Sequence, residues 1–205
     1  MRVPKFVKRG GEKKQMKNRK VYGVLAIVII AGLLSTVIPF ASATPSTPVS
    51  GQWVAVPGSQ VYSNIRAKGA NYFIDVYNKG TYTAGDMLGS FEQTFNVVIH
   101  YRSPEVVANL NPNPALRPEA PFIWYDMERT FTGTVLGVSG GFTMRLEAIG
   151  YGNSYEGPAY FNLRGTWVII SGTGGLANLH GQGTWWHSST GFAGLEYQGQ
   201  VHFDQ

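Results

Sequence analysis

Apolar and polar residues alternate along much of the chain after residue 50. Between residues 91 and 102, for example, Phe95, Val97 and Ile99 alternate with Thr94, Asn96 and His100, apart from an apolar residue at 98, and residues 142–148 and 195–204 follow the same pattern. A period of two places alternate side chains on one buried face, which is typical of β-strands. Further stretches rich in β-branched and aromatic residues lie at 52–56, 71–77, 122–136 and 160–170. Together these stretches predict about eight or nine strands.

Short segments rich in glycine and asparagine separate the strands, such as Asn78-Lys79-Gly80 and residues 137–141. After residue 43, no segment of ten or more residues has the 3.6-residue period of an amphipathic helix. Successive antiparallel strands can close on themselves and so remove their exposed edges. We therefore predict an all-β fold, a single antiparallel closed barrel of about eight strands.

The stretch from Gly165 to His187 predicts a β-hairpin. Residues 166–170 and 183–187 have strand composition, and residues 171–175 are turn formers. Gly174 or Gly175 would supply the positive φ that a tight turn needs. Residues 172–177 also match the G-x-G-x-x-G/A pattern of dinucleotide-binding loops, but that loop must open a helix, and later glycines would interrupt one within two turns. We interpret the stretch as a hairpin and not as a phosphate-binding loop.

The segment from Ser171 to Thr184 resembles the G-T-G-x-[LF]-x-x-[LA]-x-G-x-G hairpin of a large uncharacterised family of small bacterial and archaeal proteins. That family is assigned to the allene-oxide-cyclase-like (calycin-like) β-barrels, which dirigent proteins share. The resemblance runs from about Ser50 to the C-terminus, and it implies a fold without implying an activity. The catalytic residues of the plant cyclases have no matching positions here, so no catalytic residue is carried over.

The first 43 residues differ from the rest of the chain. Residues 1–20 carry nine Lys or Arg against one acid, residues 21–40 are almost entirely apolar, and Ala41-Ser42-Ala43 is a cleavage signal. This arrangement predicts a secretory signal peptide or an N-terminal membrane anchor helix over residues 1–43, a linker over 44–50 and the barrel over 51–205. We expect the domain outside the cytoplasm, either secreted or held at the membrane by this segment.

The segment also changes the meaning of the net charge. The total of +5 divides into +8 before Thr44 and −3 after it, so the basic residues belong to the signal and indicate no nucleic-acid partner. The chain has no cysteine, which excludes disulfides, a thiolate nucleophile and cysteine-based zinc sites.

One connection is unusually long. Residues 103–121 include five prolines, and their length exceeds that of ordinary hairpin loops. The two interpretations that remain open are a lid over one mouth of the barrel and a solvated decoration.

Other motifs carry little chemistry. Residues 137–141 match the G-x-S-x-G nucleophile elbow, but strands on both sides predict a hairpin turn, whereas the elbow needs a following helix. The four histidines have no metal-ligand spacing, and we expect His100 and His202 on the solvated face of their strands or in a cross-strand pair. We predict no catalytic residue, no metal and no cofactor.

The strand around Arg129 gives the best candidate site. Arg129 shares a face with Met127 and Phe131, opposite Glu128 and its polar neighbours. If that face lines the interior, Arg129 would orient an anionic or carbonyl-bearing ligand; the alternative is that it snorkels to a barrel mouth. Aromatic residues suit an interior that binds one small molecule or is filled by side chains. The predicted ligand-binding residues are Arg129, Met127, Phe131, Trp124 and Trp185.

Three functions remain open. The leading hypothesis is an exported, non-enzymatic β-barrel that binds a small, largely apolar ligand or a partner surface. The alternatives are a cofactor-independent isomerase or cyclase that uses the barrel lumen and a self-associating envelope protein. An outward tryptophan, either Trp185 or Trp186, would favour association with a second subunit. Glu128 and Glu147 pointing into the lumen beside Arg129 would favour the enzyme.

Overall fold

The computed structural model describes residues 45–113, 116–152, 162–187 and 194–204. All of them belong to one compact unit, Thr44–Gln205. The expected signal or anchor over residues 1–43 lies outside the described residues. Over the described ranges, no helix combines the length and the apolar composition needed to cross a membrane.

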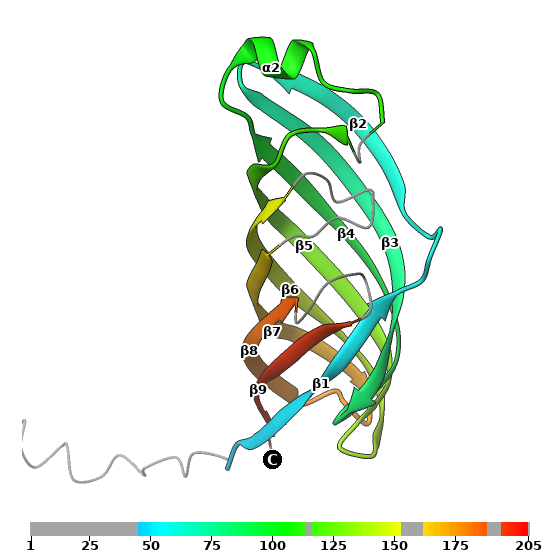
Figure 1. Cartoon of the computed structure of the whole chain (residues 1–205). Helices are drawn as coiled ribbons and strands as arrows, with labels where there is room; N and C mark the ends of the chain where they lie inside the picture. The colour runs from blue at the N-terminus through cyan, green and yellow to red at the C-terminus, as the bar shows by residue number, and fades with distance from the viewer. Residues whose placement is uncertain (1–44, 114–115, 153–161, 188–193, 205) are drawn as a thin grey trace, which may run out of the picture. The chain divides into compact units, whose positions relative to one another are not determined.

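Nine antiparallel strands form one sheet, which confirms the all-β prediction (Figure 1). The order is β1-β9-β8-β7-β6-β5-β4-β3-β2, and β1 also pairs with β3, so eight strands form a closed ring of hydrogen bonds. The strand β2 extends the sheet beside the first half of β3. The elements are β1 Thr47–Ala55, β2 Val61–Lys68, β3 Asn71–Gly85, β4 Met87–His100, α2 Pro104–Ala108, β5 Ala120–Val135, β6 Val138–Gly152, β7 Asn162–Gly174, β8 Leu179–His187 and β9 Leu195–Phe203.

The strand β1 begins at Thr47, within the segment expected to be a linker. Residues Thr47 to Ser50 pair with β9, and Val49 is buried against the core. The ladder hydrogen bonds and the buried valine make this segment part of the sheet, four residues ahead of the expected start at residue 51.

The alternation in the sequence produces one buried and one exposed face on each strand. In β5, Trp124, Met127, Arg129 and Phe131 are buried, and the residues between them are exposed or half-buried. Trp124 and Met127 are three residues apart yet face the same way, because a β-bulge shifts the register between them and Asp126 adopts a φ of 50°. The bulge therefore brings both halves of this long strand to the interior.

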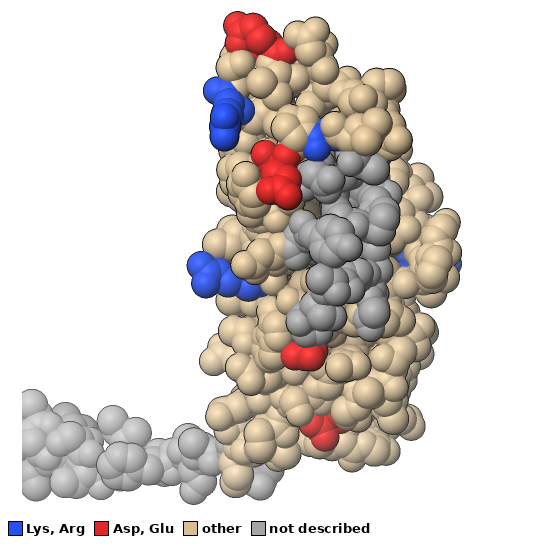
Figure 2. Space-filling view, viewed as in Figure 1, with Lys and Arg blue, Asp and Glu red and all other residues tan. Residues whose placement is uncertain are grey.

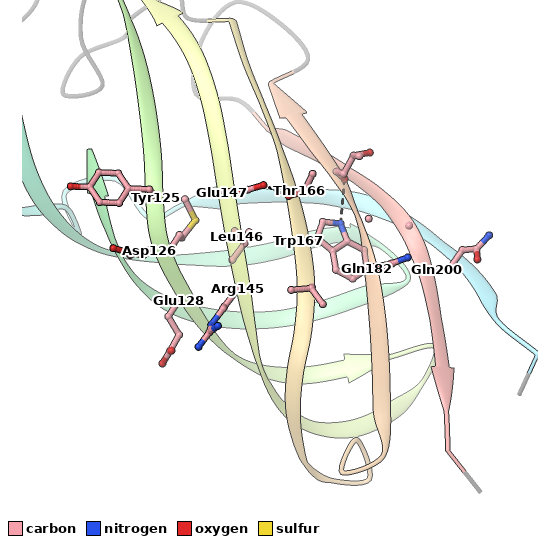
Figure 3. A pocket seen from close by; sticks show the side chains of 15 residues that line it. Tyr125, Asp126, Glu128, Arg145, Leu146, Glu147, Thr166, Trp167, Gln182 and Gln200 are labelled. Atoms are coloured by element: carbon pink, nitrogen blue, oxygen red, sulfur yellow. Dashed lines mark hydrogen bonds between the residues drawn. The ribbon is translucent and has the colours of Figure 1, made fainter. Parts of the chain in front are cut away.

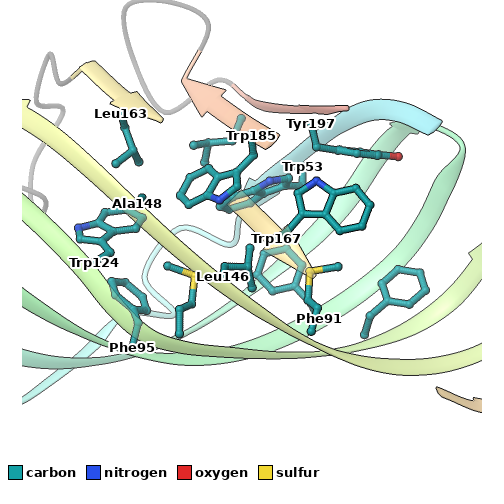
Figure 4. Packing of buried hydrophobic residues seen from close by; sticks show 14 of the residues in the cluster. Trp53, Phe91, Phe95, Trp124, Leu146, Ala148, Leu163, Trp167, Trp185 and Tyr197 are labelled. Atoms are coloured by element: carbon teal, nitrogen blue, oxygen red, sulfur yellow. The ribbon is translucent and has the colours of Figure 1, made fainter. Parts of the chain in front are cut away.

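Aromatic side chains fill much of the ring (Figure 4). Small residues on neighbouring strands make room for them. A Cβ atom on Gly183 would lie 2.6 Å from Cε2 of Trp167, and one on Gly199 would also collide with this ring. The inward glycines of the β8–β9 region thus accommodate the Trp167 side chain, since side chains of any other kind would overlap it.

The long connection after β4 packs against one end of the core. It contains the short helix α2, which begins with a proline at a position that helices tolerate (Figure 1). Val107 is buried, and Val106 and Leu110 pack against the same cluster. Of the two interpretations, the packing favours a cover over the solvated decoration.

Two predicted turns differ in the structure. Asn78, Lys79 and Gly80 were expected to form a turn but lie within β3, so this prediction was wrong. Gly80 is needed there because the Phe91 ring occupies the position of a Cβ atom, and Asn78 faces inward. The turn expected over residues 137–141 is shorter in the structure. Positive φ occurs there at Leu136 and Gly137 only, and β6 already begins at Val138.

The predicted β7–β8 hairpin is confirmed, with a later turn than expected. The strand β7 continues to Gly174, whose φ is 63°, and β8 starts at Leu179. Leu176 lies between them and is fully buried. The chain passes from strand to strand with no helix, which confirms the rejection of the dinucleotide-binding loop.

Candidate functional site

The predicted ligand-binding residues all face the interior of the ring. Trp124, Met127, Arg129 and Phe131 lie on β5, and Trp185 lies on β8. Each of the five side chains is buried, and the rings of Trp124 and Trp185 are 6.0 Å apart. Trp186 points the opposite way and is half-buried, as expected for adjacent residues of a strand.

Arg129 is held by hydrogen bonds and aromatic rings. Its Nε donates to Oε1 of Gln93 over 2.8 Å, and its Nη1 donates to the Tyr82 hydroxyl over 2.7 Å. The guanidinium carbon lies 4.1 Å from the ring centre of Trp53 and 4.0 Å from that of Phe91. The side chain is 0% exposed, so the alternative that it snorkels to a mouth was wrong.

Burial is costly for the charge of Arg129. Desolvation lowers the pKa of Arg129, whereas the Tyr82 hydroxyl opposes that change. The residues described include no carboxylate in salt-bridge contact with it, and its Nη2 has no hydrogen-bond partner. A guanidinium keeps its proton under such conditions, so Arg129 is a buried positive charge with no negative partner among the described residues.

Two further polar side chains line the interior and were not predicted. Asn78, Gln93 and Arg129 are cross-strand neighbours on β3, β4 and β5, and all three are buried. The sequence contains a signal for Gln93, because it occupies the inward position between Phe91 and Phe95 where the alternation predicts an apolar residue. Together the three residues form a buried polar row across the sheet.

Tyrosine hydroxyls complete the polar interior. The Tyr197 hydroxyl accepts a hydrogen bond from the Met87 backbone N–H over 2.9 Å. Burial raises the pKa of Tyr197 well above its usual value, with the Met87 N–H acting in the opposite direction. Tyr82 lies beside it, with ring centres 5.4 Å apart.

Side chains fill the interior beside Arg129. Phe131 stacks on Phe142 with ring centres 4.4 Å apart, and Tyr82 packs edge-on against Phe131. The remaining cavity has a volume of about 10 Å³, which is close to the minimum for one water molecule. An organic ligand that touched Met127, Arg129 and Phe131 together would require this core to open.

Larger hollows lie on the outward side of the sheet. One of about 510 Å³ crosses β5, β6, β7 and β8, and we call it the apolar groove. Its floor follows the cross-strand row from Trp124 through Ala148 and Gly165 to Trp185. Its lining residues are Ile123, Trp124, Tyr125, Glu147, Ala148, Ile149, Arg164, Gly165, Thr166, Thr184, Trp185 and Trp186.

The walls of the apolar groove are outward side chains. Ile123, Ile149, Arg164 and Trp186 form one wall, as successive partners across the four strands. Glu147 and Thr166 belong to the other wall and share a hydrogen bond of 3.2 Å. Ile149 is 51% exposed, so the groove presents apolar surface to solvent.

A second groove of about 1050 Å³ lies parallel to the first and shares the wall formed by Glu147, Thr166 and Thr184 (Figure 3). Its lining is more polar, and Glu128 and Arg145 are cross-strand partners on its far side. Both Glu128 and Glu147 are exposed, so these carboxylates lie on the opposite face of the sheet from Arg129. On the face shown in Figure 2, charged side chains are few and scattered.

His202 lies in a cross-strand pair and the G-x-S-x-G motif lies in a hairpin, as predicted. His180 and His202 are cross-strand partners with stacked rings, and each contacts Asp204. In the part of the chain that the structure describes, no cluster of His, Cys, Asp or Glu could hold a metal ion. Ser139 lies at the start of β6 in a strand-to-strand hairpin, which confirms that it is no nucleophile elbow.

No family model matches the chain, and the search of curated proteins gave no match. Among solved structures, the chain is similar to a protein of unknown function of the DUF3224 family from Shewanella oneidensis MR-1. The two are 14% identical, the similarity covers 78% of this chain and 99% of the other, and the TM-score is 0.49.

Proposed function

We propose that the domain is an exported, non-enzymatic binding protein that takes a small, largely apolar ligand in the apolar groove. The observation that carries the proposal is the groove itself. Its volume of about 510 Å³ falls within the range of small-molecule sites, and apolar side chains dominate its lining. Trp124 and Trp185 lie along its floor, although their side chains point away from the groove into the interior of the ring.

Polar groups at the walls would orient the ligand. Arg164 lies between Ile149 and Trp186 on one wall, and Glu147 lies on the other. A guanidinium can pair with a carboxylate, sulfonate or carbonyl oxygen while the apolar part contacts the isoleucines and Trp186. In this proposal Arg164 has the orienting role that was first expected of Arg129.

The side chains and the small cavity inside the ring favour a binding function over an isomerase. Among the described residues, the buried amide and charged side chains are Asn78, Gln93 and Arg129, beside the hydroxyls of Tyr82 and Tyr197, and no carboxylate is buried with them. General acid–base catalysis in a lumen needs a titratable pair near a substrate, whereas Glu128 and Glu147 lie on the outward face. The cavity beside Arg129 also offers no room for an organic substrate.

The remaining parts of the proposal rest on the sequence. The basic and apolar segment before Thr44 supports export, with the domain either secreted or anchored. The resemblance of residues 171–184, together with the closure of eight strands by the β1–β3 pairing, supports an allene-oxide-cyclase-like barrel. Self-association is the rival function, because Ile123, Ile149 and Ile170 expose apolar surface on neighbouring strands.

Two fluorescent probes test the groove. We expect saturable binding of 1-anilinonaphthalene-8-sulfonate, which is anionic, and of the neutral N-phenyl-1-naphthylamine. Ile149→Gln should weaken both by roughly tenfold, since one buried isoleucine contributes about 1.5 kcal/mol or more. Arg164→Gln should weaken only the anionic probe.

Ile170→Gln is the matched control. Ile170 is 45% exposed on the same outward face and does not line the groove, so its substitution should leave both affinities unchanged. Equal effects of the two isoleucine substitutions would refute the groove as the site. If neither probe binds and native mass spectrometry shows a dimer, self-association becomes the better account.

A further inference from the structure

We propose that the small cavity beside Arg129 is a binding site for a single halide ion. The cavity lies inside the ring and is separate from the apolar groove, so the inference does not depend on the proposed function. Its volume of about 10 Å³ admits one atom-sized guest. A phosphate, sulfate or carboxylate is too large for it.

The charge of the surroundings favours an anion. Arg129 lines the cavity, is fully buried, and has no carboxylate partner among the residues that the structure describes. The Trp53 and Phe91 rings offset part of the cost of burying this cation. A buried charge is otherwise stabilised by an opposite charge in contact with it, and a halide would supply one.

The hydrogen-bonding groups at the cavity are donors. Nη2 of Arg129 has N–H groups and no partner. Tyr197 accepts a hydrogen bond from the Met87 N–H, which leaves its own hydroxyl hydrogen available as a donor. Tyr82 accepts from Arg129, and its hydroxyl is directed at Sδ of Met144 over 3.8 Å.

This set of donors selects against water. Of the three tryptophans at the cavity, Trp167 and Trp185 already donate their indole N–H groups to backbone carbonyls, and Trp53 stacks on the Arg129 guanidinium. A water molecule could accept from Arg129 and Tyr197, but its own two hydrogens would have no strong acceptor. A halide accepts hydrogen bonds and donates none, so it satisfies the cavity more completely.

The first experiment measures the melting temperature of the full-length chain in detergent, in sodium chloride or sodium bromide against sodium gluconate at equal ionic strength. Gluconate is too large for the cavity. Above the dissociation constant, each tenfold rise in halide should raise the melting temperature by about 3 to 6 °C. Arg129→Met and Tyr197→Phe should reduce this dependence, the first more strongly. The same halide dependence in Arg129→Met would overturn the proposal.

The second experiment needs no variant. Crystals of the full-length chain grown in sodium bromide should show an anomalous bromine peak beside Nη2 of Arg129, inside the ring. A water-sized peak at this position without anomalous signal would contradict the proposal even if Arg129→Met failed to fold. So would an empty cavity.

Discussion

Arg129 lies among aromatic side chains because the alternation of β5 directs it inward and the neighbouring strands supply acceptors. Gln93 and Asn78 occupy the matching inward positions on β4 and β3. Gln93 replaces an apolar residue that the alternation predicts, whereas Asn78 lies where a turn was expected, and together with Arg129 they form a polar row across three strands. The consequence is that the stability of the core depends on the hydrogen bonds from Arg129 to Gln93 and Tyr82.

Gln93→Leu should destabilise the fold by about 1 to 3 kcal/mol, because Nε of Arg129 would lose its acceptor and stay buried. The double variant with Arg129→Met should lose less than Gln93→Leu alone, since it buries no unpaired charge. Urea unfolding measures both. Gln182→Leu, at an exposed glutamine of β8, is the matched control and should stay within about 0.5 kcal/mol of the parent. Equal losses for both leucine variants would contradict the buried hydrogen bond.

Tyr197 should make the fold sensitive to alkali. Its pKa is raised in the folded state, and an unfolded tyrosine titrates near pH 10. The folded state therefore binds this proton more tightly, so its stabilising effect is complete below about pH 10 and is lost as the pH rises toward the folded pKa. Urea unfolding from pH 8 to 11 should show the decline.

Tyr197→Phe should flatten this decline, although it lowers stability at pH 8 by removing the acceptor for the Met87 N–H. Tyr151→Phe, at a tyrosine that is 49% exposed, should leave the alkaline slope as it is. A parent slope retained in Tyr197→Phe would show that another group is responsible.

At the scale of single elements, the β7–β8 hairpin depends on its turn. Gly174 has a φ of 63°, and Leu176 in the same turn is fully buried against the core. The turn is thus part of the core and is more than a connection between two strands. A change in the shape of this turn would therefore alter both the backbone conformation at Gly174 and the burial of Leu176.

Gly174→Val should cost about 1 to 3 kcal/mol, because a β-branched residue is strained at a positive φ. Thr173→Val serves as the control, since Thr173 is an exposed strand residue where valine is tolerated. Thermal unfolding of both variants distinguishes them. Identical melting temperatures would mean that the turn has another conformation.

The elements also show what sequence patterns can and cannot predict. Alternation correctly placed Arg129, Met127 and Phe131 on one inward face. The prediction failed at Asn78-Lys79-Gly80. Gly80 is present because it makes room for the Phe91 ring, but in the sequence an Asn-Lys-Gly segment is indistinguishable from a turn. The apolar groove was not predicted, since it depends on the register of four strands, which a bulge in β5 alters.

On the scale of the whole molecule, β1 completes the ring. It pairs with β9 on one side and with the second half of β3 on the other. Trp53 of β1 lies in the core against Phe91 and Trp185. Loss of β1 would therefore expose two strand edges and remove a buried tryptophan.

A chain that begins at Thr44 should fold alone and unfold cooperatively on heating, because it retains all nine strands. A chain that begins at Pro57 lacks β1 and should be aggregated or show no cooperative transition. Size-exclusion chromatography and thermal unfolding test both. Cooperative unfolding of the shorter chain would mean that the ring closes without β1.

Ring closure also couples distant parts of the chain. Thr47 pairs with Val201, which is far away in the sequence, so we expect β9 to join β1 after the hairpins between them have formed. Until it does, the partly folded molecule has a vacant position one strand wide between β8 and β1. The segment that fits this position is β9, and a second copy can also supply it when the protein concentration approaches the effective concentration of the chain's own strand. At high protein concentration, refolding should therefore favour domain-swapped dimers in which β9 of each subunit pairs with β8 and β1 of the other.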